Sequence, residues 1–523
     1  MPTMRERVAE LERRKAAARE MGGPERVERQ HARGKWDARQ RLGRLFDAGS
    51  FDEIGVLAAH RGELPEEQGR PSPADGVICG VGRIDGRPVA AAIYDFTVFG
   101  GTIGEVGERK VARLRDIALK SRIPMVWLID SAGARIEASA GIDGRRIASF
   151  ADTGYLFREQ VVLSGVVPQV AAMMGPGAAG TAYIPALADF VPMVQGTSSI
   201  AIGGPYLVES TVGEKIGEEE LGGSKVHTAV SGVADLEVSD DEACLQAVRD
   251  YLSFFPSHCE EAPPLRPCAD PIDRRDEALL DLVPESPRRA FDMRKLVRVL
   301  ADDGRFFEIK AAWAKNLVTG LARVGGRPVG VVASNSMYYG GALDVNASDK
   351  AARFVNLCDA FRIPLLFLQD VPGFMVGSKV EQQGIIRHGA KMMYAVASAT
   401  VPKITVVVRK GYGAGYYVMC GRAFEPDLIV AWPGAEISVM GPEGMVAIAG
   451  RKMLEAAEDP AALKAELAVG LRQHIDIYRV QAMGLVDDVI DPRDTRAVIA
   501  RALERTANKR VERPYRRREI APV

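Results

Sequence analysis

A repeat within the chain limits the folds available to this sequence more than any other feature. Residues 80–130, which begin GVGRIDGRPV, align without a gap on residues 320–370, which begin GLARVGGRPV. The offset is a constant 240 residues, and about a third of the positions are identical, including Lys110 with Lys350. An ungapped match of this length indicates that the chain contains a duplicated domain.

Each copy of the repeat predicts the same order of elements. A hairpin of two apolar strands should turn at D-G-R-P or G-G-R-P. A helix should follow, with four apolar residues at helical spacing on its buried face: Val111, Leu114, Ile117 and Ala118. A short buried strand, PMVWLID or PLLFLQD, then ends at Asp130 or Asp370, and a second buried strand starts after a later proline. Alternating strands and helices predict α/β domains with layered β-sheets and surrounding helices.

The length and one proline-rich segment predict how the chain is divided. At 523 residues it is too long for one ordinary core, and about two to four domains are expected. Residues 256–273, PSHCEEAPPLRPCADPID, lack periodicity and are typical of a linker. We therefore expect a first domain over 1–258, a linker over 259–273 and a second domain over 274–515.

The composition excludes several classes of protein. Hydrophobic residues make up 47% of the chain and charged residues 26%, as in soluble globular proteins. The 68 basic and 69 acidic side chains leave a formal charge of −1, which gives no sign of a nucleic-acid or membrane surface. Residues 161–188 could span a bilayer in length, but prolines and glycines break the run. A buried strand, a turn and a helix are expected there instead.

Cysteine and histidine usage narrows the chemistry further. The cysteines are scattered without C-x-x-C spacing, which argues against a zinc ribbon or a disulfide framework and fits a reducing compartment such as the cytoplasm. They are Cys79, Cys244, Cys259, Cys268, Cys358 and Cys420. The histidines lack metal-ligand spacing, so no protein-bound metal is expected, and no glycine-rich string matches a nucleotide-binding loop. The charged N-terminus predicts a solvated helix, not a signal or transit peptide.

Two elbows of small residues follow the second buried strand of each half. They are MMGPGAAGTAYIPA, residues 173–186, and GYGAGYYVM, residues 411–419. Each should lead into a helix, whose first N–H groups have no intrahelical partner. Small residues let a ligand approach the main chain closely, and two such N–H groups aimed at one oxygen make an oxyanion hole. The alternative is that glycine and alanine only let a helix pack tightly on a strand.

Many motifs in order resemble one family. The repeat, MMGPGAAGTAYIPALADFVPMV, EKIGEEELGGSKVH, DVPGF, IIRHGAK and YGAGYYVMCGRA together are similar to biotin-dependent acyl-CoA carboxylases. More narrowly, they resemble the carboxyltransferase (β) subunit of propionyl-CoA, methylcrotonyl-CoA and related carboxylases. The resemblance runs from GKWDARQRLGRLFDAGSF to beyond Gly484. It implies a crotonase-like (ClpP/crotonase) fold in each half, with one subunit's N-terminal half facing another's C-terminal half.

The resemblance also implies roles for residues. Carboxybiotin on a separate carrier would meet an acyl-CoA, with catalytic N–H groups from Ala179 and Gly180 on the acyl-CoA side and from Ala414 and Gly415 on the biotin side. Other substrate-binding candidates are Gly133, Ala134, Arg135, Gly177, Ala178 and Tyr417, and the biotin-side candidates are Gly413, Tyr416 and His388. The expected partners are a biotin carboxylase, which would use ATP, and a biotin carrier, around a homodimer or a trimer of dimers.

One departure from the family leaves the substrate open. Tyr417 stands where propionyl-type members usually carry an aspartate, and the following MCGRA is closer to the methylcrotonyl-like branch. GPEGMV is closer to the propionyl-like branch. Propionyl, methylcrotonyl, acetyl or longer acyl groups all remain possible.

Several residues have structural alternatives. Arg135 could contact a CoA phosphate or cap its own loop. His388 could line the biotin pocket or be a structural histidine. Residues 218–220, three glutamates, are expected to begin a solvated helix.

Two other functions stay open beside the carboxylase. A biotin-dependent decarboxylase or transcarboxylase would use the same chemistry in another direction. A non-catalytic scaffold on a crotonase-like frame belongs to a different class, because a fold alone does not prove activity.

Overall fold

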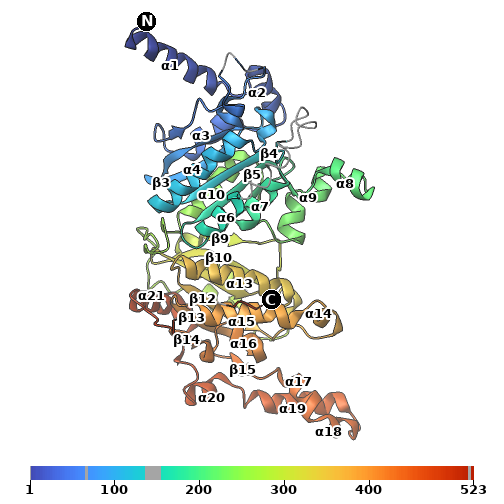
Figure 1. Cartoon of the computed structure of the whole chain (residues 1–523). Coiled ribbons are helices and arrows are strands. Elements are labelled where there is room, and N and C mark those ends of the chain that lie inside the picture. The colour runs from blue at the N-terminus through green and yellow to red at the C-terminus, as the bar shows by residue number, and fades with distance from the viewer. Residues whose placement is uncertain are drawn as a thin grey trace. The chain divides into compact units, whose positions relative to one another are not determined.

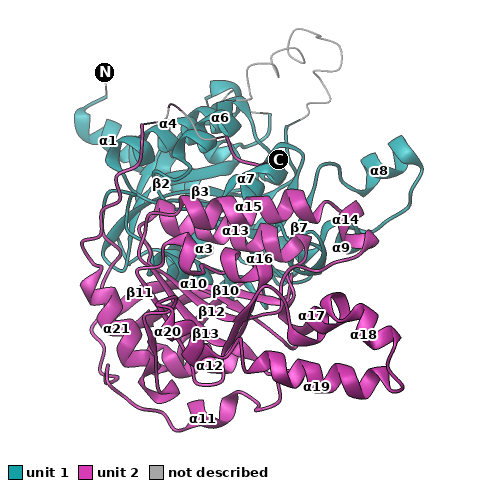
Figure 2. Cartoon of the chain, turned by 90° about the horizontal axis from the view of Figure 1, so that it is seen from below, with its two compact units in different colours: residues 1–261 teal, residues 262–523 magenta. Residues whose placement is uncertain are grey.

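The computed structural model describes residues 2–64, 67, 69–135, 155–515, 517 and 520–522. The chain divides into two compact units, residues 1–261 and 262–523 (Figure 2). The division falls between Glu261 and Ala262, inside the segment 256–273, which forms neither helix nor strand. Each unit contains one mixed β-sheet with helices packed against it (Figure 1).

Unit 1 has an eight-stranded sheet in the order β1-β2-β3-β4-β5-β6-β8, with β7 paired to β5. The strands are β1 Asp52–Ile54, β2 Val77–Ile84, β3 Arg87–Tyr94, β4 Met125–Ser131, β5 Gln169–Ala178, β6 Pro192–Val194, β7 Ser199–Ala201 and β8 Leu236–Val238. The described helices are α1 Met4–Arg19, α2 Pro24–His31, α3 Ala38–Leu45, α4 Glu105–Ser121, α6 Tyr155–Leu163, α7 Gly180–Leu187, α8 Pro205–Val212, α9 Glu218–Gly222 and α10 Asp241–Leu252.

Unit 2 repeats this sheet in the order β9-β10-β11-β12-β13-β14-β16, with β15 paired to β13. The strands are β9 Phe306–Ile309, β10 Leu317–Val324, β11 Arg327–Ser334, β12 Leu365–Val371, β13 Lys403–Tyr412, β14 Leu428–Ala431, β15 Glu436–Ser438 and β16 Asp488–Val489. The helices are α11 Ala278–Leu282, α12 Met293–Leu300, α13 Val345–Ala360, α14 Ser378–Gln382, α15 Ile385–Ser398, α16 Gly413–Val418, α17 Pro442–Ala449, α18 Arg451–Glu455, α19 Pro460–Arg472, α20 Ile477–Ala482 and α21 Thr495–Arg505.

The predicted hairpins form in both units. Strands β2 and β3 pair antiparallel, and β10 and β11 do the same. Each hairpin turns on two residues with positive φ, Asp85 and Gly86 in unit 1 and Gly325 and Gly326 in unit 2. This backbone matches the right-handed twist of the flanking strands. The strands that follow pair in parallel, so the duplication predicted from the repeat is confirmed.

The core of unit 1 lies between the sheet and its helices. Helix α4 packs on β2 and β3 and buries Val111, Leu114 and Ala118, while Ile117 is partly exposed. Trp127 of β4 lies in the same cluster and is 1% exposed. The helical spacing therefore predicted three of the four residues of the buried face correctly, and the fourth, Ile117, lies at the edge of that face.

Residues 161–188 also fold as expected. They contain the end of α6, the buried strand β5, a turn and helix α7. Among the described residues, no helix is long and apolar enough to cross a membrane. Helix α1 buries none of its residues, and residues 218–220 are exposed at the start of α9, so both are the solvated helices predicted.

The lysine shared by the two repeats does the same work in each unit. Lys110 Nζ donates to the carbonyl oxygens of Ala74 at 2.9 Å and Val77 at 2.7 Å. Lys350 Nζ lies within hydrogen-bond distance of four carbonyl oxygens, among them that of Leu317 at 2.7 Å. Burial lowers the pKa of Lys350 to about 7. Each ammonium therefore satisfies buried carbonyl groups where the chain enters the hairpin.

Asp95 of the first repeat and Asn335 of the second are equivalent residues, and comparing them shows how a buried charge affects the stability of the fold. Asp95 is 3% exposed, and its Oδ1 accepts from the Thr97 N–H at 3.0 Å. Asn335 makes the matching turn and also donates from Nδ2 to the Lys315 carbonyl at 3.0 Å. Burial raises the pKa of Asp95 to about 6. The turn thus accepts an amide, whereas an ionised carboxylate there destabilises the folded state.

We expect Asp95→Asn to stabilise the protein above neutral pH. Because the folded-state pKa is raised, Asp95 adds to stability below about pH 4, and this is lost as pH rises through about 6. Removing the ionisable group should raise the free energy of unfolding by up to about 3 kcal/mol at alkaline pH. Urea unfolding at about pH 5 and about pH 8 checks the sign, since the gain should be larger at the higher pH. An equal gain at both would contradict this cause.

Candidate active site

The two elbows occupy matching places in the two sheets. Ser131 of β4 pairs with Gly177 of β5 after a register shift, and Val371 of β12 pairs with Gly411 of β13 after the same shift. Two residues further on, Ala179 has φ 51° and Gly413 has φ 56°. A helix begins immediately after Ala179 in unit 1 and at Gly413 in unit 2. Each elbow is therefore a strand-to-helix turn through one left-handed residue.

In this register, the pair of residues in the second elbow that is equivalent to Ala179–Gly180 differs from the pair of N–H donors expected from the sequence. The counterpart of Ala179–Gly180 is Gly413–Ala414, whereas the pair expected from the sequence was Ala414–Gly415. Gly415 has a packing role, because a Cβ there would lie 2.8 Å from the Gly373 Cα. Ala414 is exposed, and Gly413 is partly exposed. The accessible part of the second elbow is thus one residue earlier than expected.

The first elbow offers Gly180 as its N–H donor. As the first residue of α7, Gly180 has an N–H that no earlier carbonyl of the helix accepts. The Ala179 N–H instead donates to the Ala201 carbonyl at 3.1 Å, so in this structure Ala179 supplies the turn and not a free donor. Among the described residues, a Cβ on Gly180 would meet only Ile103 Cδ1, at 3.8 Å. Within the described part of the chain, the Cβ position of this residue therefore faces open space.

The loop after β4 packs against the first elbow. Gly133 has φ 98°, and a Cβ there would lie 2.7 Å from the Ala178 carbonyl oxygen. Ala134 is exposed on the same loop. At Gly177 a Cβ would lie 2.6 Å from Met173 Cε, so a side chain there would displace the end of Met173. The structure thus brings the predicted residues 133–134 and 177–180 together.

Arg135 is held within unit 1. It forms an ion pair with the Asp75 carboxylate and donates to the carbonyl oxygens of Thr102 at 3.0 Å and Asp75 at 3.2 Å. Its guanidinium lies 4.7 Å from the Phe99 ring centroid, and the side chain is 8% exposed. These partners lie in other segments of unit 1, so the contacts of Arg135 are structural, but they are not within its own loop. A contact with a CoA phosphate would have to break the buried ion pair.

The predicted biotin-side residues and the substrate-binding candidate Tyr417 lie on two helices of unit 2. Tyr416 is buried, and its hydroxyl accepts from the Arg422 N–H at 3.0 Å. Tyr417 is 46% exposed and stacks on Phe424 with ring centroids 6.4 Å apart. His388 lies on α15, where its Nδ1 is 2.7 Å from Asp349 Oδ2 on α13. Tyr417 therefore faces solvent beside the elbow, while the contacts of His388 match the structural alternative.

Sequence reasoning gave no role to Tyr412, which lies within the second elbow, and missed Gln369, which contacts this elbow. Gln369 of β12 is fully buried, and its Nε2 donates to the Met419 carbonyl at 2.8 Å. In the aligned repeats Gln369 stands opposite Ile129. The sequence did contain one indication of this role, because a buried strand carries a polar residue in the second repeat where the first repeat has an apolar residue.

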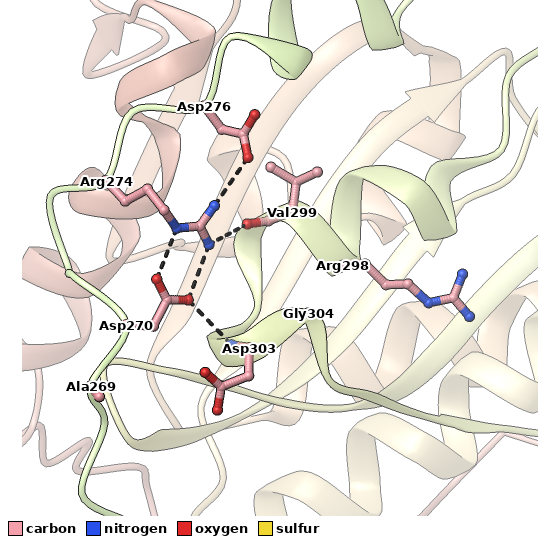
Figure 3. Close-up of a pocket in the computed structure, with 8 residues that line it drawn as sticks. All are labelled: Ala269, Asp270, Arg274, Asp276, Arg298, Val299, Asp303 and Gly304. Carbon is pink, nitrogen blue, oxygen red and sulfur yellow. Dashed lines mark hydrogen bonds and ion pairs between the residues drawn. The ribbon is translucent and has the colours of Figure 1, made fainter.

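A surface cavity of about 590 Å³ in unit 2 is lined by residues between Ala269 and Gly304, none of them from an elbow (Figure 3). Arg274 donates there to Asp270, Asp276 and the Val299 carbonyl. Arg298 points away from this cluster. The positive charge of Arg274 is thus matched by two carboxylates, and the cavity does not belong to the site.

Two duplicated α/β units with matching sheets and elbows define a protein of the crotonase-like fold. Residues 29–521 match the carboxyl transferase domain family, and the chain belongs to that family. The family resemblance and the fold expected from the sequence are therefore confirmed, and the chain is a carboxyltransferase enzyme.

Full-length relatives support this assignment. The chain is 46% identical over 517 residues to the methylmalonyl-CoA carboxyltransferase 12S subunit of Propionibacterium freudenreichii subsp. shermanii, covering 98% of this chain and 97% of that protein. It is 42% identical over 520 residues to the propionyl-CoA carboxylase beta chain of Roseobacter denitrificans, covering 99% and 100%. The solved hexameric transcarboxylase 12S, with methylmalonyl-CoA and methylmalonic acid bound, matches with a TM-score of 0.93 and 45% identity over 100% and 99% of the two chains.

Proposed function

We propose that this chain is the carboxyltransferase subunit of a biotin-dependent acyl-CoA carboxylase. It moves a carboxyl group from carboxybiotin to the α or vinylogous carbon of an acyl-CoA through an enolate. One observation carries the proposal: two accessible strand-to-helix elbows occupy equivalent positions in the two sheets. Two backbone sites of this kind suit a reaction between two carbonyl compounds.

In unit 1 the elbow binds the thioester oxygen. The Gly180 N–H lies in the first turn of α7, where the partial positive charge of the helix favours a developing enolate. Ala134, exposed on the loop that packs against this elbow, offers a second N–H. Backbone donors at these two positions would stabilise charge that appears only as the thioester becomes an enolate.

In unit 2 the elbow binds biotin. The small residues Gly413 and Ala414 leave the main chain accessible to a carbonyl oxygen, and the half-exposed ring of Tyr417 lies on the same helix. Biotin on its carrier supplies the activated carboxyl group and a ureido nitrogen that can take the substrate proton. The protein then needs to position and polarise the reactants, which explains elbows without an acid or a base.

The partners follow from this chemistry. A biotin carboxylase that uses ATP and a biotin carrier protein would supply carboxybiotin. A homodimer or a trimer of dimers is supported by the hexamer described for transcarboxylase 12S. All six cysteines lie in the described part of the chain and are free thiols, which supports a cytoplasmic location.

A transcarboxylase is the second candidate. The 46% identity to the methylmalonyl-CoA carboxyltransferase 12S subunit favours it, because that relative also spans the whole chain. A decarboxylase would use the same elbows in the reverse direction. The partners that copurify separate these candidates: a biotin carboxylase indicates the carboxylase, and a membrane subunit indicates the decarboxylase.

We expect the purified chain to carboxylate an acyl-CoA only when carboxylated biotin carrier is added. With ATP, bicarbonate and acyl-CoA alone it should form no product. The assay uses acetyl-CoA, propionyl-CoA, methylcrotonyl-CoA and a longer acyl-CoA, and mass spectrometry of the products identifies the substrate. Binding without turnover under all conditions would indicate a non-catalytic scaffold and contradict the proposal.

A further inference from the structure

Polar side chains hold both ends of helix α16, which carries the second elbow. This helix has only six residues, too few for its own hydrogen bonds to fix its direction. At the C-terminal end, Gln369 Nε2 donates to the carbonyl oxygens of Met419 at 2.8 Å and Tyr416 at 3.4 Å. These carbonyl groups would otherwise lack partners at the end of a helix.

At the N-terminal end, Tyr412 is the last residue of β13 and directly precedes α16, and its side chain is anchored. Its side chain is 5% exposed, and its hydroxyl donates to Glu436 Oε2 on β15. Glu436 Oε1 accepts from Arg472 at the end of α19 at 2.7 Å, and Arg472 also donates to Glu443 of α17 at 2.8 Å. Burial, and then the hydrogen bond to Glu436, raises the pKa of Tyr412 well above its ordinary value. The phenol therefore remains a donor.

The first elbow has no such anchor at the equivalent positions. Because the two units share this strand register, Ala178 of unit 1 is equivalent to Tyr412 of unit 2, and Ser199 is equivalent to Glu436. Ile129 stands opposite Gln369. The polar side chains around α16 are therefore a property of unit 2 and are not required by the fold that the two units share.

The left-handed residue explains why unit 2 needs an anchor. In unit 1 this residue is Ala179, whose Cβ restricts the backbone, whereas in unit 2 it is Gly413, which has more conformational freedom. A flexible residue next to a catalytic N–H lets the donor direction vary. A misplacement of about 1 Å can cost up to about 100-fold in rate.

We propose that Tyr412 is a positioning residue for carboxyl transfer: held by Glu436 and Arg472, it fixes the direction of the N–H groups at Gly413–Ala414 toward the biotin carbonyl. The inference rests on the proposed function, since it assigns biotin to this elbow. It also gives helices α17 and α19 a supporting role. Arg472 of α19 holds Glu436, and through it Tyr412. Glu443 of α17 in turn accepts from Arg472, so both helices connect the region beyond β15 to the elbow.

The test measures carboxyl transfer from methylmalonyl-CoA or malonyl-CoA to free biotin by the intact protein. In this direction the carbon–carbon bond of the thioester breaks, a nitrogen–carbon bond forms on biotin, and the biotin proton moves to the thioester. Tyr412→Phe should lower kcat/KM for biotin about 10-fold and leave the KM for the thioester within about twofold. The control is Tyr251→Phe, a buried tyrosine of α10 that packs on Phe190 4.4 Å away, which should retain wild-type constants.

A second variant covers the case in which Tyr412→Phe does not fold. Glu436→Gln keeps the shape and the acceptor for Tyr412 but loses the ion pair with Arg472, so it should change the same constant in the same direction. In the double variant the two effects should be less than additive. Wild-type kinetics in the folded single variants, or an equal change for both substrates, would overturn the inference.

Ala414→Val separates this inference from the proposed function. If Ala414→Val retains full activity, the assignment of biotin to the elbow fails whatever Tyr412 does. If Ala414→Val is inactive while Tyr412→Phe matches the wild type, only the positioning role of Tyr412 fails.

Discussion

Gly180→Val is expected to lower carboxyl transfer at least about 100-fold while the protein stays folded. Of the residues that the structure describes, a Cβ at Gly180 meets only Ile103 Cδ1 at 3.8 Å, and Gly180 has no left-handed backbone that a side chain would strain. The added methyl groups therefore occupy the open space beside the N–H, where the thioester oxygen must approach. Initial rates with carboxylated carrier and acyl-CoA measure the loss, and thermal unfolding checks the fold.

A matched control separates this effect from a general cost of valine in a helix. Gly43, in helix α3, also has no described residue close to its Cβ position, and its backbone accepts side chains. Gly43→Val should retain activity, and Gly180→Ala should fall between the wild type and Gly180→Val. Normal turnover by folded Gly180→Val would refute the assignment of the first elbow.

Mixing two inactive chains is expected to restore activity if each site uses elbows from two subunits. The variants are Gly180→Val, which keeps the second elbow, and Ala414→Val, which keeps the first. Under random assembly about a quarter of all sites should pair two intact elbows, as the isologous geometry of a two-fold dimer requires. Sites within one chain could never recover, because each chain retains one damaged elbow.

The choice of Ala414 for this experiment follows from the structure. At Gly415 a Cβ would lie 2.8 Å from both the Gly373 Cα and Val371 Cγ2, so Gly415→Val would damage the fold itself. Each variant is first shown to be inactive alone. Coexpressed chains whose mixed oligomers are demonstrated by mass spectrometry, yet which have no activity above either variant, would contradict sites shared between subunits.

The repeat made most of the fold predictable, because hairpin turns and strand ends are determined by local residues. The turns at residues 85–86 and 325–326, the buried face of α4 and both elbows all appear where the sequence placed them. Periodicity and turn chemistry act over a few residues, so they can be recognised without knowing the partner of each strand.

The alignment of the two elbows could not be predicted in the same way. The chain between Asp130 and Gly177 is longer than that between Asp370 and Gly411, so the constant offset ends before the elbows. Only the pairing of β4 with β5 and of β12 with β13 shows that Gly413, and not Ala414, matches Ala179. The sequence alone therefore could not show which residue of the second elbow matches Ala179, because register between distant strands is a tertiary property.

Buried polar partners were equally inaccessible to sequence reasoning. The identity of Lys110 and Lys350 indicated a shared role, but the carbonyl groups they bind lie 33 residues or more away along the chain. The sequence likewise does not show that Tyr412 contacts Glu436, because only the pairing of β13 with β15 brings these two residues together. Side-chain partners across a sheet depend on its order, which local patterns do not encode.

The register shift that precedes each elbow has a consequence for the evolution of the chain. Because the shift lies within the paired strands, the position of each elbow is fixed by the strand and not by the connecting loop. Changes in the length of the segments that connect β4 to β5 and β12 to β13 can therefore accumulate without moving the donor groups. A deletion inside β5 or β13 would move them at once, so tolerance of length changes should differ sharply between loop and strand.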